Sequence, residues 1–279
     1  MDSKPSDYER LRIEELNYNS YLKVPELTGL QQLQSRPPHH DEMFFIVIHQ
    51  SFELWFKEVL HEIDLLMAYL AEGHVSRTLK VLKRVTSILE CLCQQIQLLS
   101  TLTPEEFAGF REALGTGSGF QSVQFREVEF ACGLRDPWFF QFFEGRPDEL
   151  ARLEARFNAP SIYDGFLRAL ASEGYAVPAK VLERDVAAPH ELDEDVVEVI
   201  RGLYREPKEN YHWILTCEAL LDLDMLWAKW RATHILMVTR TIGGKKGTGG
   251  STGAAFLESR LKLRFFPELW EVRNADWSR

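Results

Sequence analysis

The chain has 279 residues, of which 45% are hydrophobic and 27% charged, a composition typical of a globular protein with a large core. Its formal net charge of −10 argues against nucleic acid or an anionic lipid surface as a partner, because both are bound by clustered Lys and Arg. The N-terminus is too polar for a signal peptide, and the longest apolar run, Met43 to Ile48, is far shorter than the ~20 residues that span a bilayer. We therefore expect a soluble, cytoplasmic protein without a membrane partner.

Four cysteines occur, and Cys91 and Cys93 have the spacing CxC rather than the CxxC of structural zinc sites. We interpret them as buried thiols. Stability is then expected to come from packing, since disulfides are reduced in the cytoplasm.

Apolar residues recur at helical spacing from 41 to 73, and Gly73 can end this helix as a C-cap. A second helix is predicted at 75–102, antiparallel to the first. Thr103-Pro104-Glu105-Glu106 is a helix start with a capping box, and that helix stops at Gly115. Further helices are predicted at 121–132, 147–157, 161–172, 191–204 and 208–241. With no strand pattern and no dividing linker, the fold class is all-α, with residues 1–279 forming a single helical domain.

Residues 243–253, GGKKGTGGSTG, form the low-complexity stretch of the chain. They do not have the spacing of a phosphate-binding loop, and Gly115 to Gly119 does not follow a strand as a dinucleotide fingerprint must. The stretch is therefore either a surface loop or a flexible lid over an active site.

His49 faces an aromatic stripe, because Phe45 precedes it by four residues and Phe52 follows it by three. We expect it to be buried. It is either a core histidine satisfied by Glu53 or a polar group aimed into an apolar cavity, where it orients a ligand N–H or handles a proton.

His234 has a similar setting, with Trp230 and Trp227 on the preceding turns. His234 is either a core histidine or a metal ligand. A zinc site needs three or four protein ligands, whereas haem iron can be held by one axial histidine in an apolar slot, so haem is the better fit for a ligand here. His61-Glu62 begins like a metalloprotease HExxH motif, but residue 65 is Leu, which disfavours that class.

Arg111 lies on the helix that Thr103 begins, and the positions three and four residues away offer it no ion-pair partner. A guanidinium on an apolar face needs a bidentate acceptor. This is either a distant Asp or Glu or the carboxylate of a ligand.

Four segments of the sequence show a family resemblance: HHDEMFFIVIHQSFELWFKE, LTPEEFAGFREALGTGSGFQSVQFREVE, HILMVTRTIGGKKGTGGSTG and FFPELWEVR. In this order and spacing they closely resemble the tryptophan 2,3-dioxygenase family, and the likeness extends from about Asn17 to Arg273. The resemblance implies an all-helical haem enzyme that cleaves the C2–C3 bond of the indole ring of L-tryptophan with O2. The product would be N-formylkynurenine, the first intermediate of the kynurenine route.

By position in the family's motifs, His234 resembles the axial ligand of the iron of haem b, and His49 the histidine that meets the indole N–H. Arg111 and Thr248 resemble the contacts to the charged end of the amino acid. The remaining matched positions imply pocket walls and the turn beside the oxygen site: Phe45, Phe107, Phe110, Ser118 and Gly119. Family members often have Tyr where this chain has Phe107, so a hydroxyl contact to substrate is absent there.

The resemblance also implies a homotetramer in which an N-terminal arm, residues 1–38, reaches into a neighbour's active site through Tyr18, Tyr21 and Leu22. Three rivals stay open on sequence alone. A haem sensor or carrier would need no amino-acid clamp, a helical scaffold would be colourless, and an indoleamine-type dioxygenase would accept a wider range of substrates.

Overall fold

The computed structural model describes residues 17–245 and 254–277, and within them it contains helices and no strands. Three long helices form the body: α4 (His40–Ala71), α5 (Val75–Leu98) and α12 (Pro207–Ile242). The shorter α-helices are α2 (Tyr18–Leu22), α3 (Val24–Thr28), α6 (Pro104–Arg111), α7 (Val123–Ala131), α8 (Pro147–Phe157), α9 (Ile162–Ser172), α10 (Ala179–Leu182), α11 (Glu194–Arg205), α13 (Ala254–Ser259) and α14 (Pro267–Glu271). The 3-10 turns are η1 (Leu99–Thr101), η2 (Glu112–Leu114), η3 (Gly119–Gln121), η4 (Pro137–Phe143) and η5 (Val272–Asn274). The all-α prediction is confirmed.

Local signals in the sequence explain where the first helices begin and end. Gly73 follows α4 with a φ of 71°, a conformation that glycine adopts without strain, and it turns the chain into α5. Thr103 caps α6 with the predicted capping box, and Pro104 occupies the first turn. The predicted helix at 75–102 ends earlier, at Leu98, because its last turn tightens into η1.

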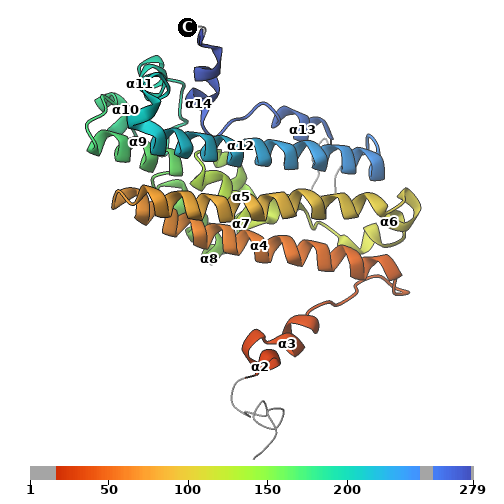
Figure 1. Cartoon of the computed structure of the whole chain (residues 1–279). Helices are drawn as coiled ribbons and strands as arrows, with labels where there is room; N and C mark the ends of the chain where they lie inside the picture. Colours follow the sequence, from red (N-terminus) through yellow and green to blue (C-terminus); the bar gives the residue numbers. More distant parts are fainter. Residues whose placement is uncertain (1–16, 246–253, 278–279) are drawn as a thin grey trace, which may run out of the picture.

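The directions of the long helices bring the two histidines to one end of the bundle. α4 packs against α5 and α5 against α12, and α4 runs antiparallel to both of the others (Figure 1). His49 lies near the start of α4 and His234 near the end of α12. Because α4 begins at the end where α12 finishes, both side chains belong to the same end, which also carries α6.

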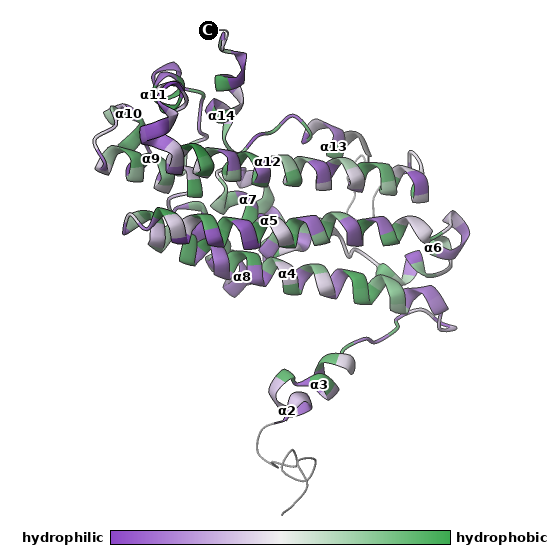
Figure 2. Cartoon of the chain, viewed as in Figure 1, coloured by the Kyte–Doolittle hydropathy of each residue, from purple (hydrophilic) through white to green (hydrophobic). Residues whose placement is uncertain are grey.

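The main core is a continuous cluster of buried side chains to which all three long helices contribute, and Phe130, Phe143 and Leu153 form a second, smaller cluster. In Figure 2 each long helix carries both hydrophobic and hydrophilic turns, as expected of helices that bury one side and expose the other. Within the described residues no helix is both long and apolar enough to cross a membrane.

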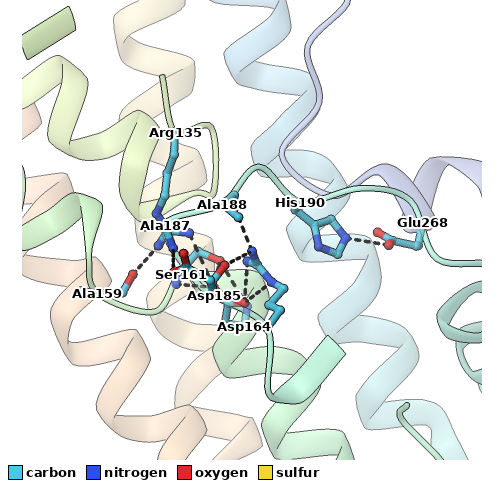
Figure 3. Close-up of polar contacts among 10 residues, drawn as sticks. Arg135, Ala159, Ser161, Asp164, Asp185, Ala187, Ala188, His190 and Glu268 are labelled. Atoms are coloured by element: carbon cyan, nitrogen blue, oxygen red, sulfur yellow. Dashed lines mark hydrogen bonds and ion pairs between the residues drawn. The ribbon is translucent and has the colours of Figure 1, made fainter. Parts of the chain in front are cut away.

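A polar network fastens the segment between α7 and α11 to the rest of the molecule (Figure 3). Asp164 of α9 accepts hydrogen bonds from the backbone and hydroxyl of Ser161 and from Arg184, at distances of 2.7 to 3.1 Å. His190 contacts Glu268 of α14 at 2.6 Å. The His190–Glu268 contact holds the loop that leads into α11 against α14, and Asp164 ties Ser161 to Arg184 within the segment.

Candidate active site

A cavity of about 310 Å³ lies at the end of the bundle shared by α4, α6 and α12. Its walls also include η3, α7 and α13. Aromatic side chains dominate the lining, among them Phe45, Phe52, Phe107, Phe125, Trp230 and Phe256. Such a concave, mostly apolar space with a few polar groups is typical of a small-molecule site.

His49 borders this cavity and is held in one tautomer. Its Nδ1 lies 2.8 Å from the carbonyl oxygen of Phe45. A carbonyl can only accept, so Nδ1 donates and Nε2 remains a hydrogen-bond acceptor in the neutral ring. Burial in the surrounding protein lowers the pKa of His49, against the Phe45 hydrogen bond and Glu53, which both raise it.

Two expectations for His49 need correction. Protein atoms surround the ring closely enough to lower its pKa, but its surface is exposed because it borders an open cavity. The partner of its ring is Phe45 and not Glu53, whose carboxylate instead accepts a hydrogen bond of 2.8 Å from Gln124. His49 is therefore the second alternative of the sequence analysis, a polar group at an apolar cavity.

His234 lines the same cavity from α12. Its ring lies 5.1 Å from that of Trp230, one turn earlier on the helix. Burial is the largest cause that lowers the pKa of His234 to about 4, and His49 and Arg126 lower it further. The imidazole is thus neutral near pH 7, with a ring nitrogen available to a metal.

α6 supplies a second aromatic wall. Phe107 lines the cavity and lies 5.9 Å from Phe45, ring to ring. Phe110 is fully buried and does not line the cavity; it packs behind Phe45 at 5.5 Å and against Phe107 at 5.4 Å. Arg111 lines the cavity at the end of this helix.

The turn after α6 completes that side. Ser118 and Gly119 line the cavity at the start of η3. The Ser118 hydroxyl accepts a hydrogen bond from the Phe120 N–H at 3.3 Å, and the Gln121 side chain accepts one from the Ser118 N–H at 3.2 Å. This reciprocal cap fixes the turn.

The floor of the cavity carries a buried ion-pair network that the sequence analysis missed. Glu129 of α7 pairs with Arg126 on its own helix and with Arg231 of α12, and all three line the cavity. Arg260 also lines it and pairs with Asp136 at 2.9 Å. Arg126 and Glu129 are three residues apart in the word FREVE, a spacing that brings them onto one helix face and is the signal that could have found them.

α13 forms a further wall of the cavity, and no helix was predicted there. Phe256 lies 5.0 Å from Phe120 and 5.5 Å from Trp138, ring to ring. The cavity is therefore closed on this side by residues that follow the glycine-rich stretch.

Besides Phe110, three predicted residues in the described part of the chain do not line the cavity. Tyr18, Tyr21 and Leu22 lie on α2 with exposed side chains, and none of them lines the cavity of its own chain. Thr248 lies outside the described residues.

The fold and the cavity together define a class: an all-helical protein whose ligand site is walled by aromatic rings and served by two neutral histidines on different helices. The sequence profile of a family described as tryptophan 2,3-dioxygenase matches residues 6–144 and 199–275. The chain belongs to this family.

Similar proteins bear the same name. The chain is 45% identical to the tryptophan 2,3-dioxygenase of Arthrobacter sp. (strain FB24), over 93% of this chain and 91% of that protein. It is 44% identical to that of Herpetosiphon aurantiacus, over 92% of this chain and 97% of that protein. For the enzyme of Myxococcus xanthus the identity is 42%, over 92% of this chain and 88% of that protein.

Proposed function

We propose that the protein is a haem-dependent dioxygenase that cleaves the C2–C3 bond of the indole ring of L-tryptophan with O2, giving N-formylkynurenine. The observation that carries the proposal is the pair of neutral imidazoles, His49 and His234, on one aromatic cavity that Arg111 also lines. Family membership supports the same activity.

The residues at the cavity suit haem b. His234 is neutral and would offer a ring nitrogen to the haem iron. Within the described part of the chain no three His, Cys, Asp or Glu side chains gather as a metal-binding group, so a single imidazole fits a porphyrin better than a bare metal ion. The buried Nε1 of Trp230 and Nε of Arg126 have no hydrogen-bond partner, and both residues line the cavity, where a polar guest can accept from them.

When bound, ferrous haem supplies the dioxygen chemistry, and the protein's own groups bind and orient the amino acid. Nε2 of His49 accepts the indole N–H, since Nδ1 is committed to Phe45. Phe45 and Phe107 pack against the indole ring and exclude water, with Ser118 and Gly119 beside the site of oxygen.

Arg111 binds the substrate carboxylate, and Thr248 contacts the charged end of the amino acid. A substrate without its carboxylate would leave the guanidinium at an apolar wall without that acceptor, so the clamp selects for amino acids. The indole-binding walls alone would discriminate weakly.

Residues 1–279 act in this proposal as one helical domain that assembles into a homotetramer. Residues 1–38 form an arm that brings Tyr18, Tyr21 and Leu22 to the active site of a neighbouring subunit, and residues 243–253 form an active-site loop. The exposure of Tyr18 and Tyr21, 74% and 70%, supports a contact outside their own chain.

The test is the formation of N-formylkynurenine from L-tryptophan by the reduced, haem-loaded protein, compared with D-tryptophan and tryptamine. We expect product from L-tryptophan and little from tryptamine, which lacks the carboxylate. Equal turnover of all three would contradict the clamp, and no product would refute the activity.

The axial ligand is tested by His234→Ala, which should remove or greatly weaken the Soret band of the bound haem. His61→Ala, at an exposed position of α4, is the control and should keep it. A normal Soret band in the His234 variant would assign the iron ligand to another side chain.

A further inference from the structure

A buried carboxylate, that of Glu42, lies where the N-terminal arm joins α4. Glu42 lies in the first turn of α4 and is 1% exposed. Its Oε1 accepts from the backbone N–H of Gln34 at 2.7 Å, and its Oε2 from the backbone N–H and hydroxyl of Ser35 at 3.0 and 2.5 Å. All three donors belong to the end of the N-terminal arm, so one side chain of the bundle holds the arm where it leaves.

Glu42 is held as a carboxylate. Burial by itself would raise its pKa, but the hydrogen bonds from Ser35 and Gln34 outweigh burial and lower it. Hydrogen bonds to a charged acceptor are stronger than neutral ones. Gln31 makes the neighbouring side-chain tether, a neutral contact of 2.5 Å to Gln50 of α4.

The same contact reaches α6 through His39. The backbone N–H of His39 donates to the Ser35 hydroxyl at 2.8 Å. The His39 ring then packs against α6: it lies 5.6 Å from Phe110, and a Cβ on Gly109 would lie only 2.5 Å from its Nε2. Glycine is thus required for this close approach, and the arm, α4 and α6 meet at one point.

α6 carries residues of the proposed substrate site, since Phe107 and Arg111 line the cavity. On the other side of Glu42 the arm leaves the body of the molecule, and α2 and α3 stand apart from the bundle (Figure 1). The Glu42 carboxylate therefore connects the N-terminal arm to the contact between α4 and the substrate-binding helix α6.

We propose that Glu42 is a positioning residue: it fixes the arm at residues 34–35 and, through Ser35 and His39, seats α6 against α4, and thereby sets the affinity for substrate. The affinity part rests on the proposed function. The structural part, which concerns residues 17–38 and α6, does not depend on any activity.

The first experiment is hydrogen–deuterium exchange of the full-length protein carrying Glu42→Gln. The amide keeps one acceptor oxygen but turns an NH2 group toward donors of Gln34 and Ser35. We expect faster exchange in residues 17–38 and in α6, with the exchange of α5 unchanged. Wild-type exchange in the arm segment would overturn the proposal.

The control is Asp41→Asn, which removes a negative charge from the same first turn of α4; Asp41 contacts the His39 ring but makes no contact with Gln34 or Ser35. It should leave the exchange of residues 17–38 as in the wild type. An equal effect of the control would assign the change to helix-terminus electrostatics and overturn the proposal.

Ser35→Ala provides a second variant in case Glu42→Gln fails to fold. It removes only the arm's hydroxyl and should give the same pattern at smaller amplitude. The double variant should then show a less than additive effect, because both changes break the Ser35–Glu42 contact, while Ser35→Ala also removes the acceptor of the His39 N–H; full additivity would contradict the shared contact.

The second experiment separates KM from kcat on the haem-loaded enzyme. Glu42→Gln should raise KM for L-tryptophan by about tenfold, the effect of losing one charge-assisted hydrogen bond, with kcat within about twofold. Faster exchange with an unchanged KM would refute the link to the substrate site. If the wild type makes no product, the proposed function fails while the exchange result on the arm still stands.

Discussion

Replacement of Glu129 by Gln should destabilise the protein by about 3–5 kcal/mol, the usual cost of removing one partner of a buried ion pair. The Glu129 side chain is 2% exposed, and both of its partners, Arg126 and Arg231, are 8% exposed. Burial already lowers the pKa of Arg126 to about 10 despite the attraction of Glu129. Without that carboxylate two guanidinium groups remain in the cavity floor, and Asp136, paired with Arg260, is the remaining anion of the network.

The assay is urea unfolding of the apoprotein, followed by far-UV circular dichroism. Glu198→Gln is the control, since Glu198 pairs with Arg201 while its side chain is 57% exposed. The control should lose less than about 1 kcal/mol, as exposed ion pairs do. If Glu129→Gln also lost less than about 1 kcal/mol, the network would be solvated in solution and our reasoning on the cavity floor would be wrong.

Three further predictions concern the cavity and its supports. Tryptophan affinity should weaken as the pH falls through the pKa of His49, which lies below the ordinary value of 6.5, because only the neutral ring accepts the indole N–H. The affinity of His49→Ala, measured over the same pH range, should show no such step. A step in both proteins would assign the titration to another group. Phe256→Ala removes ring contacts to Phe120 and Trp138 and should raise KM several-fold; an unchanged KM would exclude α13 as a substrate wall. Asp224→Asn weakens a buried carboxylate's hydrogen bonds to the C-terminal segment and should cost about 2 kcal/mol in urea unfolding, whereas a loss within experimental error would show that those contacts add no stability.

Helices with strong local signals were predictable from the sequence. Thr103 and Pro104 at α6, and Gly73 after α4, place helix ends through side-chain capping and backbone freedom, which depend on neighbours in the chain. The prediction at 147–157 coincides with α8, which begins at Pro147. The short helices α2, α3, α10, α13 and α14 have four to six residues each, too few for a periodic pattern. Of these, α10, α13 and α14 are held by contacts with α9, α11 and α12 that the local sequence does not show.

The residues of the candidate site were predictable where a polar side chain lay among apolar ones in the sequence. His49 and His234 were identified by aromatic neighbours at helical spacing, and both line the cavity. Exposure was not predictable, because periodicity shows which face of a helix turns inward but not whether that face meets packed side chains or a hollow. Phe110, which the family resemblance implies as a pocket wall, is likewise buried behind the lining residues.

Arg126, Glu129 and Arg231 place buried charges beside the cavity, while the groups proposed to meet the iron and the indole stay neutral. Burial lowers the pKa of His234, and the cation of Arg126 adds to that effect. A carboxylate in the place of Arg126 would act in the opposite direction and favour a protonated ring, which cannot bind iron. The ion pairs of Glu129 therefore hold Arg126 where its charge favours the ligating form of His234, so the cavity floor links the stability of α7 and α12 to the chemistry expected of the site.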